Sequence, residues 1–547
     1  MTASHVRLDG SDRPPRRGAV RVGDVRAGSR IEVTVSVRHP ELPTPGSPLT
    51  RVQVEDRYLV SPHDTAAVRR VLGRFGLAVE VGSLATGSLV ARGTAAQIEA
   101  AFRPGLGVYR SADGVRYRGR EGHLEIPRAL RGIVTGVFGL DQRRVAHRRL
   151  RAAVAAPRVP GMVAPAPLGP AELERLYRFP AGDGAGQTIA IAEFGGGYFP
   201  EDVRRFCRRY GREVPAITTV PVGLRPLTRE GIAALSADRR AEARGQSREV
   251  MMDIQIVAGL CPRASIQVLF APFHQKGWVD LLDRAIALDP PPVALSVSWG
   301  SAEDSDDWSP AARLAINHRL HAAALLGITV CAATGDNGSG DGMGDDRAHV
   351  HFPASSPFVL AVGGTMRADR REVAWWNAPG DQSKPRGGST GGGVSVEFDR
   401  PAWQRVRRVR SINPGARDGR TIPDVAALAG LPGYQLVWNG RPTMNGGTSA
   451  ATPLWAALIA RIASCRPQAA PMFLTPLLYA RGIERRVRGR SAFRDITEGE
   501  NASPQPGRGY RAGQGYDAVS GWGVPDGKAL LASLGRAAGP SRGRPPR

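Results

Sequence analysis

Hydrophobic and polar positions divide this chain into two regions with different periodicities. Within the first 150 or so residues, helix-periodic segments are interleaved with short β-type runs. These patterns predict helices at 63–75 and 95–102 and strands at 30–37, 77–81 and 88–92. From Thr188 onward, short apolar runs alternate with longer helical segments, which is typical of a parallel, doubly wound sheet. The pattern predicts a small α+β domain followed by a larger α/β domain.

A serine flanked by glycines precedes an apolar, helix-periodic stretch of the second region. The sequence GGTSAATP at 446–453 places Ser449 at a turn just before this stretch, whose apolar positions are 454, 455, 458, 459 and 462. A helix that begins there directs backbone N–H groups and its positive dipole end toward developing negative charge. The same residues also suit plain helix capping. Ser449 is a candidate nucleophile only if the chain supplies a base.

Carboxylates are better candidates for that base than histidines. None of the ten histidines lies in a His-Gly-Thr context, the context of the base in subtilisin-type enzymes. Glu249 and Asp253 are four residues apart in a helix-periodic stretch and therefore share one face. This pair is either a solvated helix face or a catalytic pair. Apolar neighbours in the stretch favour burial, which pushes one carboxyl pKa of such a pair upward.

Further polar side chains follow predicted strands. The carboxyl ends of the strands in an open α/β sheet form the edge at which ligands bind. A turn aspartate before Asn-Gly also has a purely structural explanation. The groups at this edge are Asp336 after the run that begins at Ile328, Glu193 after 188–192, and Ser298 with Trp299 after 293–297.

These residues, in this order, resemble the sedolisin (serine-carboxyl peptidase) family, particularly its kumamolisin-like members. Other motifs similar to the family are IAEFGGGY at 191–198, SVSWG at 296–300, FPASSP at 352–357, VGGT at 362–365 and PDVAA at 423–427. The resemblance extends along almost the whole chain. It implies a subtilisin-like, doubly wound catalytic domain preceded by a ferredoxin-like α+β propeptide, the pro-kumamolisin type of activation domain.

The resemblance implies a role for each candidate residue. Ser449 would be the nucleophile, Glu249 the general base and later acid, Asp253 its orienting partner, and Asp336 the oxyanion-hole residue. A carboxylate is a much weaker base than an imidazole, so we expect an enzyme that works in acid. There a protonated Asp336 can donate a hydrogen bond to the tetrahedral oxyanion, which an ionised carboxylate cannot do.

Three more residues resemble supporting positions of the family. Glu193 and Trp299 correspond to residues that extend the acid network, although simple packing or lining of a subsite would also explain Trp299. Ser298 precedes Trp299 and is assigned to the same group. One departure stands beside the base, since Arg248 occupies a position where many relatives have glycine.

A calcium site is expected near the C-terminus. Asp495 and Asp517 bracket a glycine-rich loop that can turn backbone carbonyls toward a hard cation. Asp-Gly loops are common turns, so the spacing alone is weak. The resemblance implies one structural Ca²⁺ held by these two side chains and by backbone oxygens at Ile496, Gly513 and Gly515.

The predicted organisation is that of a self-processing zymogen. Between 142 and 169 the chain is rich in arginine, alanine and proline, which suits an exposed linker open to cleavage. The domain boundaries expected are an activation domain at 1–150 with the first 18 residues disordered, a processing linker at 151–168, a catalytic domain at 169–535 and a disordered tail at 536–547.

Composition excludes several other classes of protein. The net charge of +24 comes from arginines spread through the chain rather than from one basic patch, and no recognised nucleic-acid motif accompanies them. The four cysteines lie far apart, without a Cys-x-x-Cys motif, which argues against a zinc site and against thioredoxin-like chemistry. No apolar run is long enough to span a membrane, and residues 1–20 have no apolar signal-peptide core. Extracellular location is therefore expected from the resemblance alone.

The overall expectation is a monomeric, acid-acting serine endopeptidase that cleaves proteins or peptides. Its own propeptide would serve as an intramolecular inhibitor. Neither a membrane nor a specific nucleic acid is expected as a partner. Two alternatives remain: a catalytically inactive relative that binds peptides, and a polyanion-binding protein whose retention on nucleic acid depends on salt.

Overall fold

The computed structural model describes most of the chain. It covers residues 4–537 except 47, 146–165, 369–370, 378–386, 416–417, 467–470 and 481–489. The predicted linker at 151–168 therefore lies almost entirely outside the described residues, as does most of the predicted tail at 536–547. Among the described residues, no helix is both long and apolar enough to cross a membrane.

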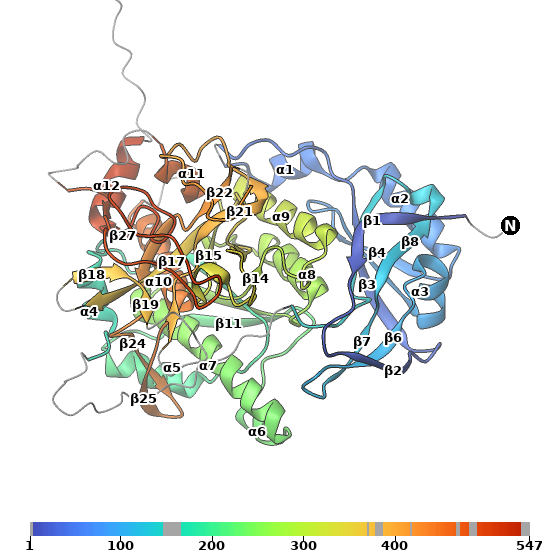
Figure 1. Cartoon of the computed structure of the whole chain (residues 1–547), viewed down its shortest axis with the longest axis horizontal. Helices are drawn as coiled ribbons and strands as arrows, with labels where there is room; N and C mark the ends of the chain where they lie inside the picture. Colours follow the sequence, from blue (N-terminus) through green and yellow to red (C-terminus); the bar gives the residue numbers. More distant parts are fainter. Residues whose placement is uncertain are drawn as a thin grey trace, which may run out of the picture.

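The N-terminal domain is built on a four-stranded antiparallel sheet in the order β4-β5-β3-β9. With two helices between its strands, this order is that of a ferredoxin-like fold (Figure 1). The domain has its own apolar core, formed by alternate strand positions and the inner faces of the helices. The predicted elements agree with the observed β3 (Arg30–Val37), α2 (Pro62–Gly73), β4 (Ala78–Ser83), β5 (Ser88–Thr94) and α3 (Ala95–Phe102). The fourth strand, β9 (Val134–Phe138), was not predicted.

The expected disorder of residues 1–18 is wrong for most of that segment. Residues 5–13 form β1 (His5–Arg13), which pairs with β8 (Gly122–Pro127) in antiparallel register. Leu8 is 4% exposed and packs into the apolar core of the domain, so the segment has a hydrophobic anchor despite its polar composition. The other elements of this domain are β2 (Val20–Asp24), α1 (Arg51–Tyr58), β6 (Gly107–Arg110), β7 (Arg116–Gly119) and the 3-10 turn Arg128–Leu130.

The larger domain, called the catalytic domain after its predicted role, contains an eight-stranded sheet, which is parallel except for β18. Its order is β11-β12-β10-β13-β15-β17-β18, with β23 also pairing with β17. Predicted strands at 188, 293 and 328 correspond to β10, β13 and β15. The strands are β10 (Thr188–Glu193), β11 (Ala216–Pro221), β12 (Ser265–Phe270), β13 (Ala294–Val297), β15 (Thr329–Ala333), β17 (Leu360–Ala368), β18 (Arg371–Ala374) and β23 (Val425–Leu428).

Helices cover both faces of this sheet. Along β10, Ile189 and Ile191 contact one apolar core, and Ala190 and Ala192 contact the other, as period-two alternation requires. The first core contains α7 (Ala237–Leu260) and α10 (Thr448–Ser464), which pack against each other. The second contains α8 (Gln275–Ile286) and α9 (Pro310–Leu325).

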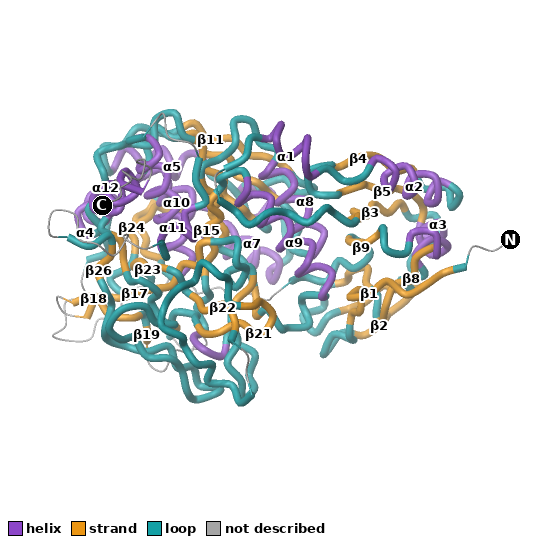
Figure 2. Tube along the Cα trace, turned by 90° about the horizontal axis from the view of Figure 1, so that it is seen from above, coloured by secondary structure: helices purple, strands orange, loops and turns teal. Residues whose placement is uncertain are grey.

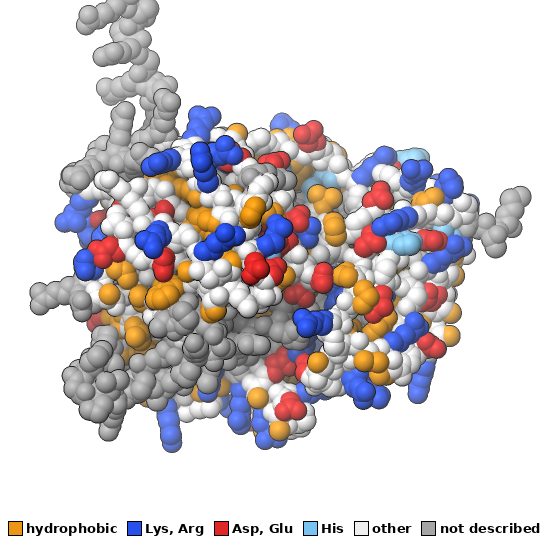
Figure 3. Space-filling model, in the orientation of Figure 1, with side chains coloured by type: hydrophobic (Ala, Val, Ile, Leu, Met, Phe, Trp, Pro, Cys, Tyr) orange, Lys and Arg blue, Asp and Glu red, His pale blue; other side chains and the backbone are white. Residues whose placement is uncertain are grey.

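Shorter elements complete the catalytic domain. The helices are α4 (Pro170–Leu176), α5 (Pro200–Arg209), α6 (Arg229–Ala233), α11 (Leu474–Leu478), α12 (Gly527–Ala537) and the 3-10 turn Gly338–Gly340. The strands are β14 (Ser301–Ala302), β16 (His351–Phe352), β19 (Trp376–Asn377), β20 (Gly388–Ser389), β21 (Gly393–Asp399), β22 (Gly419–Ile422), β24 (Tyr434–Trp438), β25 (Arg441–Asn445), β26 (Phe493–Arg494) and β27 (Val524–Pro525). On the face drawn in Figure 3, basic side chains are interspersed with acidic ones.

The N-terminal domain docks on α8 and α9, which lie between it and the catalytic sheet (Figure 2). Thr34 donates to Oδ1 of Asp280 at 2.7 Å, and Ser88 donates to Oδ2 of Asp283 at 2.5 Å. Lys276 contacts Glu32 across the interface at 2.8 Å. Hydroxyl–carboxylate hydrogen bonds and one ion pair therefore connect the two domains here.

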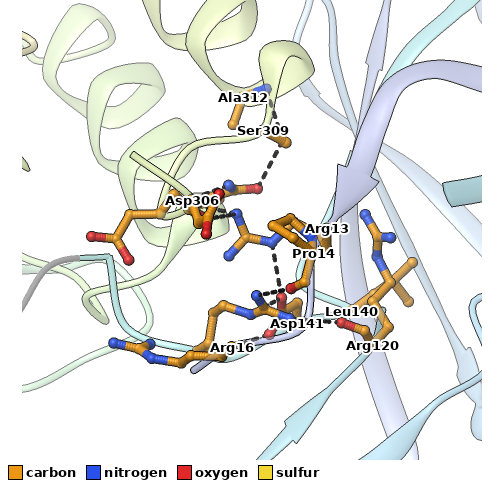
Figure 4. A network of polar contacts seen from close by, with 12 residues as sticks. Arg13, Pro14, Arg16, Arg120, Leu140, Asp141, Asp306, Ser309 and Ala312 are labelled. Atoms are coloured by element: carbon orange, nitrogen blue, oxygen red, sulfur yellow. Dashed lines mark hydrogen bonds and ion pairs between the residues drawn. The ribbon is translucent and has the colours of Figure 1, made fainter. Parts of the chain in front are cut away.

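A second set of contacts joins the end of β1 to the catalytic domain (Figure 4). Arg13 pairs with Asp141 at 3.0 Å and donates to the carbonyls of Asp306 and Asp307 at 3.0 and 2.9 Å. Arg143 contacts the same carboxylate at 2.7 Å. The segment that leads into the predicted linker is thus held between the two domains.

Candidate active site

The acidic pair lies in the middle of α7. Glu249 is 3% exposed and Asp253 is fully buried, so the pair faces the interior rather than solvent. Apolar residues occupy the surrounding positions of the helix and contribute to the core shared with α10. Of the two interpretations left open by the sequence, the structure excludes the solvated helix face.

Ser449 lies in the first turn of α10 and is 1% exposed. Pro453 follows it by four residues and has no N–H, so the carbonyl of Ser449 lacks its usual helical partner. The hydroxyl of Ser298 lies 3.2 Å from that carbonyl and 2.6 Å from Oδ2 of Asp253. Ser298 therefore connects the acidic pair on α7 to the serine on α10. In return, Ser449 Oγ lies 3.4 Å from the carbonyl of Ser298.

Asp336 follows β15 and contacts the start of the same helix. Its Oδ1 accepts hydrogen bonds from the backbone N–H and the hydroxyl of Thr448, both at 2.8 Å. Its Oδ2 lies beside Gly447, where a Cβ atom would be only 2.6 Å away. Gly447 also has φ +97°, which favours glycine. Glycine at 447 thus allows Asp336 to approach the peptide that precedes Ser449.

Glu193 and Trp299 form a buried pair beside this group. The indole N–H of Trp299 donates to Oε2 of Glu193 at 3.1 Å, and the two residues are 3% and 0% exposed. The Trp299 ring also packs edge-on against Phe273, with ring centroids 5.2 Å apart. Trp299 therefore has both a polar contact to an acid and an apolar packing role.

A contact between His351 and Asp341, beside the turn that precedes Asp336, could not be predicted from the sequence. His351 Nδ1 lies 2.8 Å from Oδ2 of Asp341, and a Cβ atom on Gly335 would be 3.1 Å from that ring nitrogen. The pair supports the turn that precedes Asp336. Ten residues separate its members in a loop without periodicity, so the local pattern does not predict their contact.

The loop that follows Asp336 is fixed by a second charged cluster. His349 contacts Asp304 and Asp345, each at 2.8 Å. Burial lowers the pKa of His349, but the two carboxylates outweigh it and raise the pKa to about 9. His349 also donates its backbone N–H to the carbonyl of Ser339 at 2.8 Å. The charged imidazolium thus anchors the segment adjacent to the candidate site.

The predicted calcium ligands gather around one glycine-rich loop. Asp517 accepts the N–H of Gly513 at 2.9 Å, and Asp495 accepts the N–H of Gly515 at 2.7 Å. Burial raises the pKa of Asp517 to about 6, against the opposing effect of its peptide donors. The two carboxylates and the adjacent backbone oxygens, including that of buried Ile496, are hard donors suited to Ca²⁺.

Side chains alone do not make a metal site here. Across the described residues, no group of three or more His, Cys, Asp or Glu side chains is arranged to hold a metal ion. A cation at this loop would therefore depend on backbone carbonyls as well as on Asp495 and Asp517.

Comparisons with known proteins identify the family. The pro-kumamolisin activation domain matches residues 30–143, and the subtilase family matches residues 241–489. Kumamolisin from Bacillus sp. (strain MN-32) is 37% identical over 562 aligned residues, which cover 96% of each chain. The chain belongs to the sedolisin family of serine-carboxyl peptidases.

Other relatives agree with this assignment. Tripeptidyl-peptidase sed5 of Aspergillus fumigatus is 30% identical over 97% of each chain. Tripeptidyl-peptidase 1 of Homo sapiens is 31% identical over 67% of this chain and 64% of that protein. The structure of Pseudomonas sedolisin complexed with pseudo-iodotyrostatin is similar with a TM-score of 0.57 and 26% identity, covering 69% of this chain and all of that one. This sedolisin-family member is a serine-type peptidase, and because its chain includes an activation domain, it is a zymogen.

Proposed function

We propose that this zymogen is an acid-acting endopeptidase that cleaves peptide bonds through an acyl-enzyme on Ser449. The observation that carries the proposal is the position of Ser298, whose hydroxyl lies within hydrogen-bond distance of both Asp253 and the carbonyl of Ser449. It joins the acidic helix to the nucleophile helix. Nucleophilic catalysis needs a base within reach of the nucleophile, and this contact connects the helix that carries Glu249 to the first turn of the helix that carries Ser449.

In the proposed reaction, Glu249 takes the proton of Ser449 Oγ as the oxygen attacks the substrate carbonyl. Asp253, one turn further along α7, orients Glu249. The carbon–nitrogen bond then breaks, and Glu249 returns the proton to the leaving amine. Water attacks the acyl-enzyme by the same route in reverse, which releases the acid product and restores Ser449.

Asp336 is the proposed donor to the oxyanion. Because its Oδ1 already accepts two hydrogen bonds from Thr448, a proton on this carboxyl group would reside on Oδ2. The N-terminus of α10 adds a positive dipole end to the same region. The need for a protonated donor is the reason for expecting activity in acid.

The activation domain is proposed to inhibit the enzyme until it is cleaved. Its contacts through Glu32, Thr34 and Ser88 hold it on α8, and Arg13 holds the start of the segment before the predicted linker. We also propose extracellular action, a monomeric state, and neither a specific nucleic-acid partner nor a membrane partner. Cleavage within 151–168 remains part of this proposal.

One Ca²⁺ is proposed to stabilise the C-terminal part of the catalytic domain. Asp495 and Asp517 would hold it together with the backbone oxygens of Ile496, Gly513 and Gly515. The ion would neutralise two carboxylates that lie near one loop. None of the proposed catalytic residues belongs to this set, so the ion would have a structural role.

The test is to incubate the purified full chain near pH 4 and to follow its intact mass and its cleavage of a denatured protein. Self-processing and cleavage in acid, with covalent labelling of Ser449 by a fluorophosphonate, would support the proposal. Cleavage of substrates with a blocked N-terminus would distinguish an endopeptidase from an enzyme that releases tripeptides. A folded protein that neither labels nor cleaves would favour the inactive, peptide-binding alternative.

A further inference from the structure

Arg248 is a cation beside the candidate active site with no anionic partner among the described residues. It directly precedes Glu249 on α7, and its guanidinium lies 5.5 Å from the ring centroid of Trp438. Within the described part of the chain, no carboxylate lies within 4.0 Å of it, and no hydrogen bond to its side chain is present. The aromatic ring supports one face of the guanidinium and leaves its edge for an acceptor.

The position of Arg248 is fixed by the packing of a hairpin against α7. Gln255, two turns further along the helix, exchanges hydrogen bonds of 2.8 and 2.7 Å with the backbone of Val437 on β24. The second strand of this hairpin, β25, ends at Asn445, four residues before Ser449. The contact between Arg248 and Trp438 therefore joins the segment that carries the base to the segment that leads to the nucleophile.

A small cavity lies at this junction, with a volume of about 20 Å³. Its lining is apolar apart from a few polar groups and offers no anion to Arg248. Burial, and the positive charge of Arg244, lower the pKa of Arg248, so its charge lacks compensation within the described residues. The residues around the cavity include Arg248, Met251, Trp438, Thr443, Met444 and Asn445.

Two other arginines near the hairpin, Arg229 and Arg205, differ from Arg248 because their side chains have acceptors. Arg229 lies 4.2 Å from the ring centroid of Phe199, but it also pairs with Asp202 at 2.7 Å. Arg205 donates to the carbonyl of Gly440 at 3.0 Å. Unlike these two arginines, Arg248 has no acceptor among the described residues, and it directly precedes Glu249.

We propose that Arg248 is a specificity-determining residue that binds an acidic side chain of the peptide substrate close to the scissile bond. This inference rests on the peptidase function proposed above. A glutamate or aspartate in the extended substrate would place its carboxylate against the edge of the guanidinium, over Trp438. The substrate would supply the anion that the described residues do not.

The test uses pairs of peptides that are identical except for Glu or Gln at each position within three residues of the cleaved bond. kcat/KM is measured at pH 5, where a glutamate side chain is mostly ionised. At one of these positions the wild type should prefer Glu over Gln by about tenfold, the effect of a charge-assisted hydrogen bond. The ratio of kcat/KM for the Glu peptide to kcat/KM for the Gln peptide does not depend on the fraction of enzyme that is active.

Three variants make the test decisive. Arg248→Gln should abolish the preference, and Arg248→Glu should replace it with a preference for Lys at the same position. Arg244→Gln removes an equal charge one turn earlier on the exposed side of α7 and should retain the wild-type ratio. Full cleavage of the Gln peptides with no preference for Glu in the wild type, or an unchanged ratio in Arg248→Gln, would overturn the assignment. Failure of the wild type to cleave any peptide would instead overturn the proposed peptidase function, and this inference with it.

Discussion

Carboxylates at the candidate active site and carboxylates at the domain interface have different hydrogen-bond donors. At the active site, Glu193 receives a bond from a tryptophan N–H, and Asp253 receives one from a serine hydroxyl. At the interface, Glu32 pairs with Lys276 of the other domain, and Asp283 pairs with the buried Arg319 of its own domain while it accepts a hydrogen bond from Ser88. The active-site carboxylates are therefore held by neutral donors, whereas the interface carboxylates have cations among their donors.

This difference predicts opposite responses to acid. A protonated carboxyl group can still accept a hydrogen bond from a neutral donor through its other oxygen lone pairs. An ion pair loses its electrostatic attraction when the carboxylate is protonated. Acidification should therefore leave the catalytic cluster assembled while it weakens the Glu32–Lys276 pair that joins the activation domain to α8. The proposed maturation in acid would need both responses.

The largest effect is expected from removal of the nucleophile. Ser449→Ala should abolish cleavage of added protein and self-processing, because loss of a catalytic unit costs on the order of 10⁶ in rate. Rates would be followed by intact mass and by peptide release near pH 4. Ser464→Ala, at the other end of α10, is the matched control and should mature normally. Maturation of a Ser449→Ala chain at the wild-type rate in isolation would contradict the role of Ser449.

The next effect concerns the contact between Asp336 and α10. Asp336→Asn keeps a neutral donor but changes its geometry, so kcat should fall by at least about 10², the typical cost of one oxyanion contact. The wild type should be most active in acid and lose activity toward neutral pH, because the proposed mechanism needs a protonated donor to the oxyanion. A pH–rate profile from 3 to 9 checks both points. An activity maximum above pH 8, or full activity of Asp336→Ala, would contradict the proposed role of Asp336 as the protonated donor to the oxyanion.

The sequence predicted the regular elements of the fold well, because their signals are local. β10 alternates between two apolar cores, and β3 was predicted at its observed bounds because period-two burial depends only on neighbouring residues. β1 was not predicted, because the contacts that hold it are made with residues far away in the sequence. Its Arg13 is 2% exposed because Asp141 and two carbonyls accept its hydrogen bonds, and composition cannot reveal a partner 128 positions away.

The residues of the candidate site were proposed from the sequence, but the contacts that connect them were not. The roles of Ser449, Glu249 and Asp336 came from a family resemblance rather than from spacing. The link from Asp253 through Ser298 to Ser449, and the support of Gly335 by His351, depend on strands and helices that meet only in the folded chain. Such contacts are set by tertiary packing, and a local sequence pattern carries no information about them.

Calcium tests a third carboxylate environment, in which the partner would be a cation from outside the chain. A ligand that binds only the folded state at a hundred times its Kd stabilises that state by about 2.7 kcal/mol, so a chelator should lower Tm. The loss should be smaller in Asp517→Ala, and smaller at pH 4 than at pH 7, because protonated carboxylates are poor ligands. Thermal melts with calcium and with chelator give the comparison. Equal Tm values for the wild type in both, after metal analysis confirms removal, would leave Asp495 and Asp517 as ordinary loop residues.

The smallest effect is expected at the interface ion pair. Burial acts to raise the pKa of Glu32, but Lys276 and Arg92 outweigh it, and the net pKa is lowered from 4.5. Its contribution to docking is therefore present above pH 4.5 and is lost as pH falls through the lowered value. Because Glu32 is 42% exposed, solvent screening limits the effect to at most about fivefold.

Glu32→Gln tests this sign directly. The variant should self-process up to about fivefold faster than the wild type at pH 5.5, and the difference should shrink at pH 3, because wild-type Glu32 gains a proton as pH falls through its lowered pKa. Glu80→Gln is the matched control, because Glu80 pairs with Arg92 within the activation domain and does not contact Lys276. First-order rates of maturation by intact mass give the measurement. A rate difference that is equal at both pH values would show that the charge of Glu32 is not what holds the activation domain, and the contrast between the two carboxylate environments would then rest on Asp283 and Asp141 alone.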